Sequence, residues 1–253
     1  MTPSSGALSD YAARLGDDSL ILGQRLSEWC GHAPALEVDL SVANLALDLI
    51  GQAQHFLGYA AELRGQGEDA DGLAFHRDVL EFKNCLLVEQ PNGDYARTIA
   101  RQFLFSTYQE LYLDRLSRSV DPTLAGIAQK AVKEVAYHAT FAREWVVRLG
   151  DGTDESRRRM AEGLDWMWRF VDELFVVDAL EEGLVANGVA VDRARLRQPW
   201  DASVSAAFAQ ATLDPPKPHR AVLGGRTGRH SEHLGHLLAE MQSVPRAHPG
   251  ASW

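Results

Sequence analysis

Histidines and carboxylates are the side chains in this sequence whose spacing could build a metal centre. A di-iron carboxylate site in a helical bundle takes a Glu from each of two helices and a Glu-x-x-His pair from each of two others. Residues three apart share a helix face, so both members of a pair reach the same metals. The residues three positions before the nine histidines are Trp29, Gln52, Leu73, Val135, Pro216, Thr227, His230, His233 and Pro245. None is acidic, so both pairs that this chemistry needs are missing.

Two segments resemble altered versions of such a pair. Leu49 occupies the carboxylate position and Gln52 the imidazole position of one pair. Val135 occupies the carboxylate position three residues before His138 in the other. We therefore predict no catalytic, cofactor-binding or metal-ligating residue in this chain. We expect the vacated site to be filled by apolar groups and by hydrogen bonds, with its vestigial candidates being Glu28, Asp48, Gln52, Val135 and His138.

Two other hypotheses stay open at this point. A catalytically active oxygenase with an atypical ligand set would have to use Glu28, Asp48, Glu134 and His138. The missing acidic partners argue against it, because a bridging carboxylate is what neutralises two adjacent irons. A stand-alone helical binding or storage protein is the third hypothesis.

The elements that must position these residues are long helices. Apolar residues recur at helical spacing, and strand-like alternation is nearly absent. Helices are predicted over residues 8–29 with Ser9 as N-cap, 36–63, 73–82, 95–117, 122–149 after the N-cap Asp121, from 153 onward, and 231–241. Four of them have roughly 22 to 30 residues, which is typical of a helical bundle. We predict an all-α single domain over 1–253, with a core bundle over 8–190 and a C-terminal linker and helix over 191–253.

Composition excludes several classes of function. The net charge is −10, which disfavours binding to nucleic-acid phosphates. No segment approaches the roughly 20 apolar residues of a membrane span, and residues 1–6 lack a secretory signal pattern. Cys30 and Cys85 cannot form a disulfide framework. We expect a cytoplasmic protein that binds neither membranes nor nucleic acid.

Five separated motifs carry a resemblance that covers residues 11–253. They are EWCGHAP at 28–34, NLALDLIGQA at 44–53, LVEQPNG at 87–93, KEVAYH at 133–138 and GRHSEHLG at 228–235. In this order they resemble the PaaC subunit family of the bacterial phenylacetyl-CoA epoxidase. The resemblance implies a ferritin-like fold with a C-terminal helical or extended tail.

The resemblance also implies a place in a multicomponent monooxygenase. In that complex the sister subunit PaaA holds the di-iron site and binds the CoA thioester, and a reductase supplies electrons from NADPH. The reaction adds one oxygen atom of O₂ across the aromatic ring of phenylacetyl-CoA, in aerobic phenylacetate catabolism. A PaaC-type chain is implied to be a non-catalytic scaffold, a pseudoenzyme within a hetero-oligomer that also includes small subunits. It pairs with PaaA and stabilises it, and the missing Glu-x-x-His pairs agree with that role.

Four further features each allow two interpretations. His230, His233 and His236 are three apart; we favour the polar face of a tail helix over a metal patch. The aromatic residues of 166–175 indicate core packing, or alternatively an anchor to a partner subunit. The run Arg157-Arg158-Arg159 indicates a solvated helix face, or contacts with the phosphates of a substrate held by the partner. The glycine-rich residues 224–229 do not fit a phosphate-binding loop and are predicted to be a flexible connector, or alternatively an arm at a subunit interface.

Overall fold

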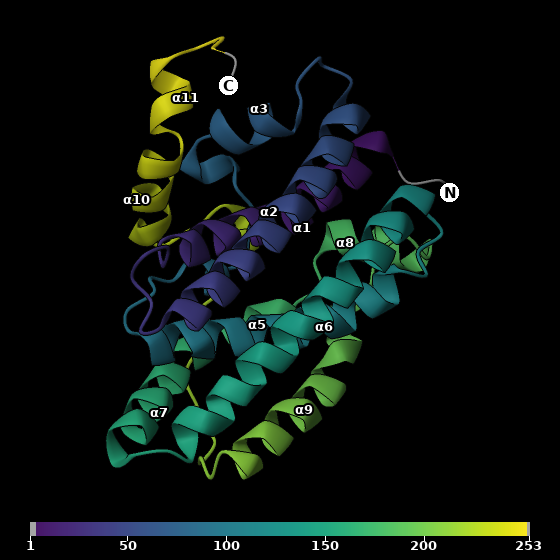
Figure 1. Ribbon diagram of the computed structural model, residues 1–253. Helices are drawn as coiled ribbons and strands as arrows, with labels where there is room; N and C mark the ends of the chain where they lie inside the picture. The colour runs from purple at the N-terminus through teal and green to yellow at the C-terminus, as the bar shows by residue number, and fades with distance from the viewer. Residues whose placement is uncertain (1–3, 252–253) are drawn as a thin grey trace. The chain divides into compact units, whose positions relative to one another are not determined.

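The protein is all-α over residues 4–251, the part described by a computed structural model (Figure 1). The α-helices are α1 (Ser5–Ser27), α2 (Leu36–Arg64), α3 (Ala70–Phe75), α4 (Leu86–Glu89), α5 (Tyr95–Leu116), α6 (Pro122–Gly150), α7 (Asp154–Trp168), α8 (Ala179–Ala186), α9 (Arg197–Gln210), α10 (Glu232–Met241) and α11 (Ser243–Ala247). Short 3₁₀ turns are η1 (Val79–Glu81), η2 (Val171–Phe175), η3 (Arg193–Leu196) and η4 (Gly225–Thr227). These described residues contain no strand, which confirms the predicted class.

The four long predicted helices are present as α1, α2, α5 and α6, with 23, 29, 22 and 29 residues. Within the described residues, no helix is both long and apolar enough to cross a membrane. The predicted C-terminal region over 191–253 ends with the short helix α11 and the residues after it. Its last two residues lie outside the described part, as do residues 1–3 of the N-terminal segment.

Three local predictions were wrong. Ser4, not Ser9, caps α1, and its hydroxyl accepts a hydrogen bond from the backbone N–H of Ala7. The helix predicted over 73–82 ends at Phe75 and is followed by η1, because residues 76–78 interrupt the helical backbone. The region predicted as a C-terminal linker from 191 contains the helix α9, which tolerates Pro199 because this proline falls in the first turn.

The chain divides into two compact units. One unit takes the chain up to Gln90 and again from Gly224 onward, and the other runs from Pro91 to Leu223. The segment from Gly224 onward thus belongs to the same unit as α1 and α2. A single domain over 1–253 stays a prediction.

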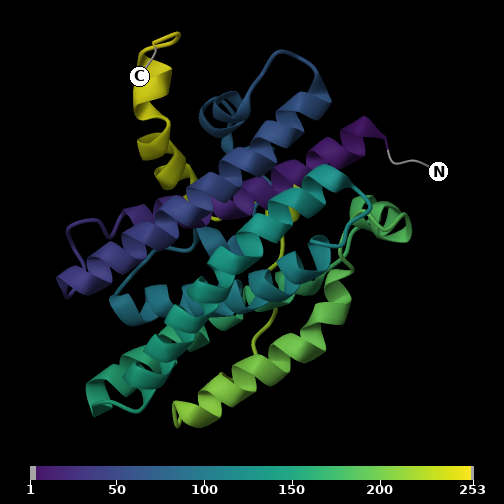
Figure 2. The ribbon, with the colours of Figure 1, turned by 45° about the vertical axis from the view of Figure 1, so that its right-hand side comes forward.

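The first unit is built on α1 and α2, which lie side by side in both views (Figures 1 and 2). Glycines on α1 allow this close approach. A Cβ at Gly16 would lie 2.6 Å from Cγ of Leu57, and one at Gly23 would lie 3.3 Å from the carbonyl oxygen of Ala46. The α2 helix ends at Gly65, whose φ of 64° is the left-handed conformation that closes many helices.

The second unit packs α5 against α6, α7 and α9. Asp94 caps α5, and Asp121 caps α6 as predicted, with Pro122 in the first turn. Trp200 of α9 is completely buried and donates its indole N–H to the carbonyl oxygen of Leu104, 3.0 Å away. This bond satisfies the one polar atom of the largest buried side chain and fixes α9 on α5.

Candidate functional site

On α2, the altered pair Leu49 and Gln52 lies on the buried face. Leu49 is completely buried, and Gln52 is 2% exposed. Gln52 is also the one buried polar side chain of this helix. A neutral amide and an isobutyl group therefore occupy the inward positions where the di-iron pattern needs imidazole and carboxylate.

On α6, the second altered pair is buried in the same way. Val135 and His138 are both 0% exposed, and His138 is the one buried polar side chain of α6. The spacing argument therefore identified inward-facing positions correctly on both helices. The imidazole has no carboxylate three residues before it, so this helix supplies one ligand of the expected pair at most.

The remaining candidates are not buried acids. Glu28 is exposed at the C-cap of α1, and its carboxylate accepts a hydrogen bond from Arg25 at 2.7 Å. Asp48 on α2 and Glu134 on α6 are half-buried. The predicted hydrogen bonds between the two altered pairs stay a prediction.

The donor set does not fit a di-iron centre. In the described part of the chain, no group of three or more His, Cys, Asp or Glu side chains is arranged to hold a metal ion. Neither α2 nor α6 has a buried carboxylate. An amide and one imidazole would leave the charge of two iron ions uncompensated.

Buried carboxylates do occur in the first unit, but each is held by a cation. Asp17 is completely buried. Its carboxylate accepts hydrogen bonds from both terminal nitrogens of Arg77, one of them at 3.1 Å, and from the backbone N–H of Lys83 at 2.8 Å. The carboxylate of Asp18 accepts hydrogen bonds from Arg226 at 2.5 Å and from the backbone N–H of Cys85 at 2.7 Å. Two adjacent acids of α1 thereby fix the loop after α3 and the segment after Gly224.

Glu89, the last residue of α4, is the third buried acid of this unit. Its carboxylate accepts hydrogen bonds from Asn84 at 2.9 Å and from the backbone N–H of Ser231 at 2.6 Å, and it pairs with His230 Nδ1 at 2.7 Å. His230 Nε2 lies 2.8 Å from the carbonyl oxygen of Phe82. Both ring nitrogens face acceptors, and this arrangement favours the doubly protonated, cationic imidazole.

The pKa of His230 agrees with this geometry. Burial alone lowers it, but the hydrogen bond and the charge of Glu89, with smaller help from the Phe82 carbonyl and Asp17, raise the pKa above its ordinary value. His230 and Glu89 therefore form a buried pair in which the imidazolium form is favoured, and this pair anchors the segment before α10 to α4.

The three histidines His230, His233 and His236 do not share one polar face of the tail helix. His230 precedes the helix and points into the buried pair, whereas His233 is half-buried and His236 is exposed on α10. The predicted flexible connector 224–229 is also wrong in part, because it contains the turn η4 and the buried guanidinium of Arg226. A Cβ at Gly225 would lie 2.1 Å from the carbonyl oxygen of Asn84, so the glycine serves close packing.

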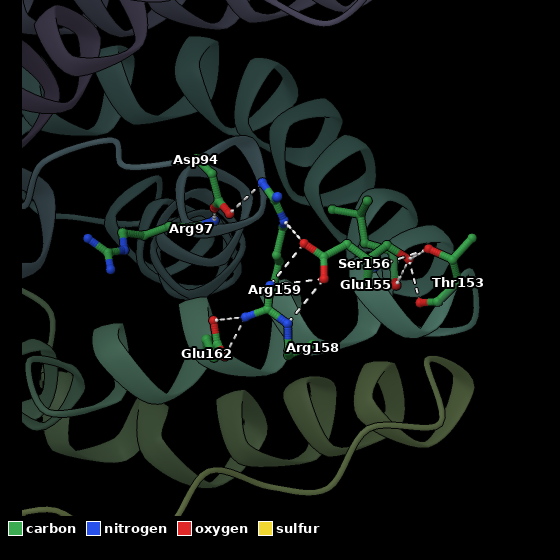
Figure 3. A network of polar contacts seen from close by, with 9 residues as sticks. Asp94, Arg97, Thr153, Glu155, Ser156, Arg158, Arg159 and Glu162 are labelled. Carbon is green, nitrogen blue, oxygen red and sulfur yellow. Dashed lines mark hydrogen bonds and ion pairs between the residues drawn. The ribbon is translucent and has the colours of Figure 1, made fainter.

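Two arginines of the run on α7, Arg158 and Arg159, belong to an exposed network of ion pairs in the second unit (Figure 3), whereas Arg157 donates to the hydroxyl oxygen of Thr212 at 2.8 Å. Arg158 pairs with Glu155 at 2.9 Å and with Glu162 at 2.7 Å. Arg159 contacts Glu155 at 2.7 Å and Asp94 at 3.6 Å. Hydrogen bonds from Arg159 and Arg158 lower the pKa of Glu155. These guanidinium groups already hold carboxylates, which favours the predicted solvated face over a phosphate site.

The aromatic stretch 166–175 does not form one helix, because α7 ends at Trp168. Phe170 and the η2 residues Leu174 and Phe175 are buried. The Trp200 ring contacts the tilted ring of Trp168, with centroids 5.6 Å apart, and meets Phe175 edge to face at 5.4 Å. Core packing accounts for this part of the stretch; the role of an anchor to a partner stays a prediction.

Comparison with known proteins places this helical chain. A family model described as "Phenylacetic acid catabolic protein" matches residues 2–253. The chain belongs to the phenylacetic acid catabolic protein family. This family has a ferritin-like helical fold, which confirms the predicted fold class.

A curated relative covers nearly the same length. The C subunit of the 1,2-phenylacetyl-CoA epoxidase of Escherichia coli (strain K12) is 51% identical over 246 residues. The alignment takes in 97% of this chain and 99% of that relative. The resemblance stated from the five motifs is thereby confirmed for this member of the phenylacetic acid catabolic protein family.

Sequence reasoning missed the buried ion pairs, although one signal was available. Asp17 and Asp18 stand in the middle of a long helix, one residue before the apolar run Leu20-Ile21-Leu22. Acids inside an apolar segment indicate a buried and paired carboxylate, since unpaired buried charge is very costly. Their partners lie 60 and 208 residues away, and no local pattern announces those.

Proposed function

We propose that this chain is a non-catalytic structural subunit of a phenylacetyl-CoA epoxidase that pairs with a sister subunit holding the di-iron site and stabilises it. The near full-length similarity to the C subunit of such an epoxidase supports membership of the complex. The observation that carries the non-catalytic role is the donor set of α2 and α6, whose buried polar side chains are Gln52 and His138 alone.

In this proposal the chain contributes rigidity. A di-iron centre needs its ligands held within about half an ångström, and rigid neighbouring elements supply that precision. The buried pairs of Asp17, Asp18 and Glu89 join segments far apart in the sequence into one unit. Such a unit offers a fixed surface to a partner without taking part in chemistry itself.

The remaining components follow from the same proposal. The partner is a PaaA-type subunit, which supplies di-iron and binds the CoA thioester, and this chain has no cofactor of its own. A reductase passes electrons from NADPH to the complex, small subunits belong to the same assembly, and O₂ is the second substrate. The assembly is a cytoplasmic hetero-oligomer acting in phenylacetate catabolism.

The test is the iron content of this chain, purified alone and then after co-expression with the PaaA-type subunit. We expect no iron in the isolated chain and about two irons per pair of chains in the complex. The variant His138→Ala serves as a matched probe, because it removes the buried imidazole of α6. It should leave the iron of the complex unchanged. Iron in the isolated chain, lost in this variant, would instead support the oxygenase with the atypical ligand set.

A further inference from the structure

Two guanidinium groups of the second unit lie over one indole ring. The guanidinium carbons of Arg97 on α5 and of Arg169 at the C-cap of α7 are each 4.7 Å from the centroid of the Trp166 ring. They are therefore no further from each other than twice that distance. A cation over an aromatic face is stabilised by the ring, so two positive charges can be held close together here.

Backbone packing places these three side chains together. A Cβ at Gly163 would lie 2.9 Å from the Cα of Arg97, so α7 crosses α5 in direct backbone contact. Trp166 follows one turn later on the same face of α7. Gly93 has a φ of 60° and lies against the side chain of Arg97, because a Cβ there would come within 2.8 Å of Cδ.

These two arginines differ from the other arginines of α7. Among the described residues, neither guanidinium group of Arg97 and Arg169 is within hydrogen-bond or ion-pair distance of an acceptor, whereas Arg158 and Arg159 each hold carboxylates. In Figure 3 the side chain of Arg97 points away from Asp94 and from the network around Glu155.

Nearby carboxylates are already engaged. Asp94 accepts the backbone N–H of Arg97 at 2.9 Å and contacts Arg159, and Asp165 lies 3.0 Å from Nε2 of His219. Within the described chain, the buried Nε of Arg169 and the buried Nε1 of Trp166 also lack a hydrogen-bond acceptor. A buried N–H without an acceptor costs free energy, so an anion that brings acceptor oxygens is favoured.

We propose that Arg97, Trp166 and Arg169 form a binding site for the phosphate groups of a small organic diphosphate. A guanidinium stacked by its face keeps its in-plane N–H donors free, and this fork matches phosphate oxygens. The two positive charges match a dianion better than a single carboxylate. Arg97 also stands in the first turn of α5, where the helix dipole favours negative charge. The site goes beyond the proposed structural role, which assigns no ligand to this chain.

The test is calorimetric titration of the full chain with inorganic pyrophosphate, ADP and citrate at constant ionic strength. We expect pyrophosphate and ADP to bind, with citrate at least about tenfold weaker, because its carboxylates are spread over a longer skeleton. Binding of ADP without pyrophosphate would locate recognition in the nucleoside and overturn the proposal. Equal binding of citrate would show attraction of charge only, with the same consequence.

Variants decide whether these residues hold the anion. Arg97→Gln and Arg169→Gln should each weaken pyrophosphate binding by about tenfold or more, the loss expected for a charge-assisted hydrogen bond. Arg115→Gln, an exposed arginine of the same helix α5, removes the same charge and should leave binding unchanged. Arg97→Lys keeps the positive charge but not the paired N–H donors of a guanidinium, so it should weaken pyrophosphate binding by an intermediate amount. Thermal unfolding followed by circular dichroism checks that each variant is folded.

Two results would overturn the site. One is wild-type protein that binds no pyrophosphate at millimolar concentration. The other is an equal loss in Arg115→Gln, which would mean an adventitious ion only. Neither result depends on whether the chain joins an epoxidase complex, because the titration uses the chain alone and the iron measurement tests the complex separately.

Discussion

Replacing Asp18 by Asn should destabilise the first unit strongly, although the two side chains are nearly the same size. The carboxylate is 4% exposed and accepts two hydrogen bonds, one from Arg226 at 2.5 Å and one from the backbone N–H of Cys85 at 2.7 Å. An amide oxygen can keep the bond to Cys85, but the amide nitrogen then faces a guanidinium that also only donates. Arg226 is left as an uncompensated charge with 9% exposure.

The magnitude follows from that loss. Removing one partner of a buried ion pair costs about 3–5 kcal/mol, a large share of a typical unfolding free energy of about 5–15 kcal/mol. Urea unfolding measures it directly, and hydrogen exchange of residues 224–231 should report faster opening of that segment. The control is Asp10→Asn, an exposed acid on the same helix, which should change stability by less than about 0.5 kcal/mol.

A double-mutant cycle separates the pair from the rest of the site. Asp18→Asn combined with Arg226→Met removes both charges, so it should cost clearly less than the sum of the two single variants. The reasoning is refuted if Asp18→Asn loses no more stability than Asp10→Asn. It is refuted equally if the two single losses simply add.

Two further perturbations test other parts of the structure. Burial lowers the pKa of His230, but Glu89 raises it by more, so the pKa in the folded protein lies above the ordinary 6.5. The extra stability of wild type over His230→Gln should therefore be complete below about pH 6.5 and should fall as the pH rises through the folded pKa. A difference in urea unfolding that does not change with pH would contradict this. Gly163→Ala should lower the free energy of unfolding by about 1–3 kcal/mol, because its Cβ would meet the α5 backbone at 2.9 Å. The control Gly126→Ala, on the open face of α6, should instead raise it by about 0.4–1 kcal/mol. Similar effects of the two variants in thermal unfolding would refute the close crossing of α7 and α5.

The long helices could be predicted because their signals are local. Asp121 followed by Pro122 marks the start of α6, and Gly65 marks the end of α2. Three-residue spacing also identified Gln52 and His138 as inward-facing. The helix α9 and the turn η4 were not predicted, because tertiary packing determines them more than the local sequence pattern does. The buried Trp200 holds α9, and Asp18, 208 residues earlier in the sequence, fixes Arg226 of η4.

The candidate site could be predicted only as a loss of ligands. Absence of Asp or Glu three residues before a histidine is readable from the sequence alone, so the missing pairs were visible before any coordinates. The pairing of His230 with Glu89, 141 residues away, was not, because a histidine near a helix start has the same local pattern whether it is buried or exposed. Periodicity identifies the face of a helix, but only the fold identifies the partner.

Buried charge in the first unit holds together segments that are far apart in the sequence. In this chain α2 and α6 bury one polar side chain each, while α1 buries Asp17 and Asp18 against arginines from two distant segments. Those ion pairs act between elements as a metal would, at protein positions that need no cofactor. In the structural role that we propose, the chain gains from this arrangement, because the rigidity of its first unit does not depend on iron.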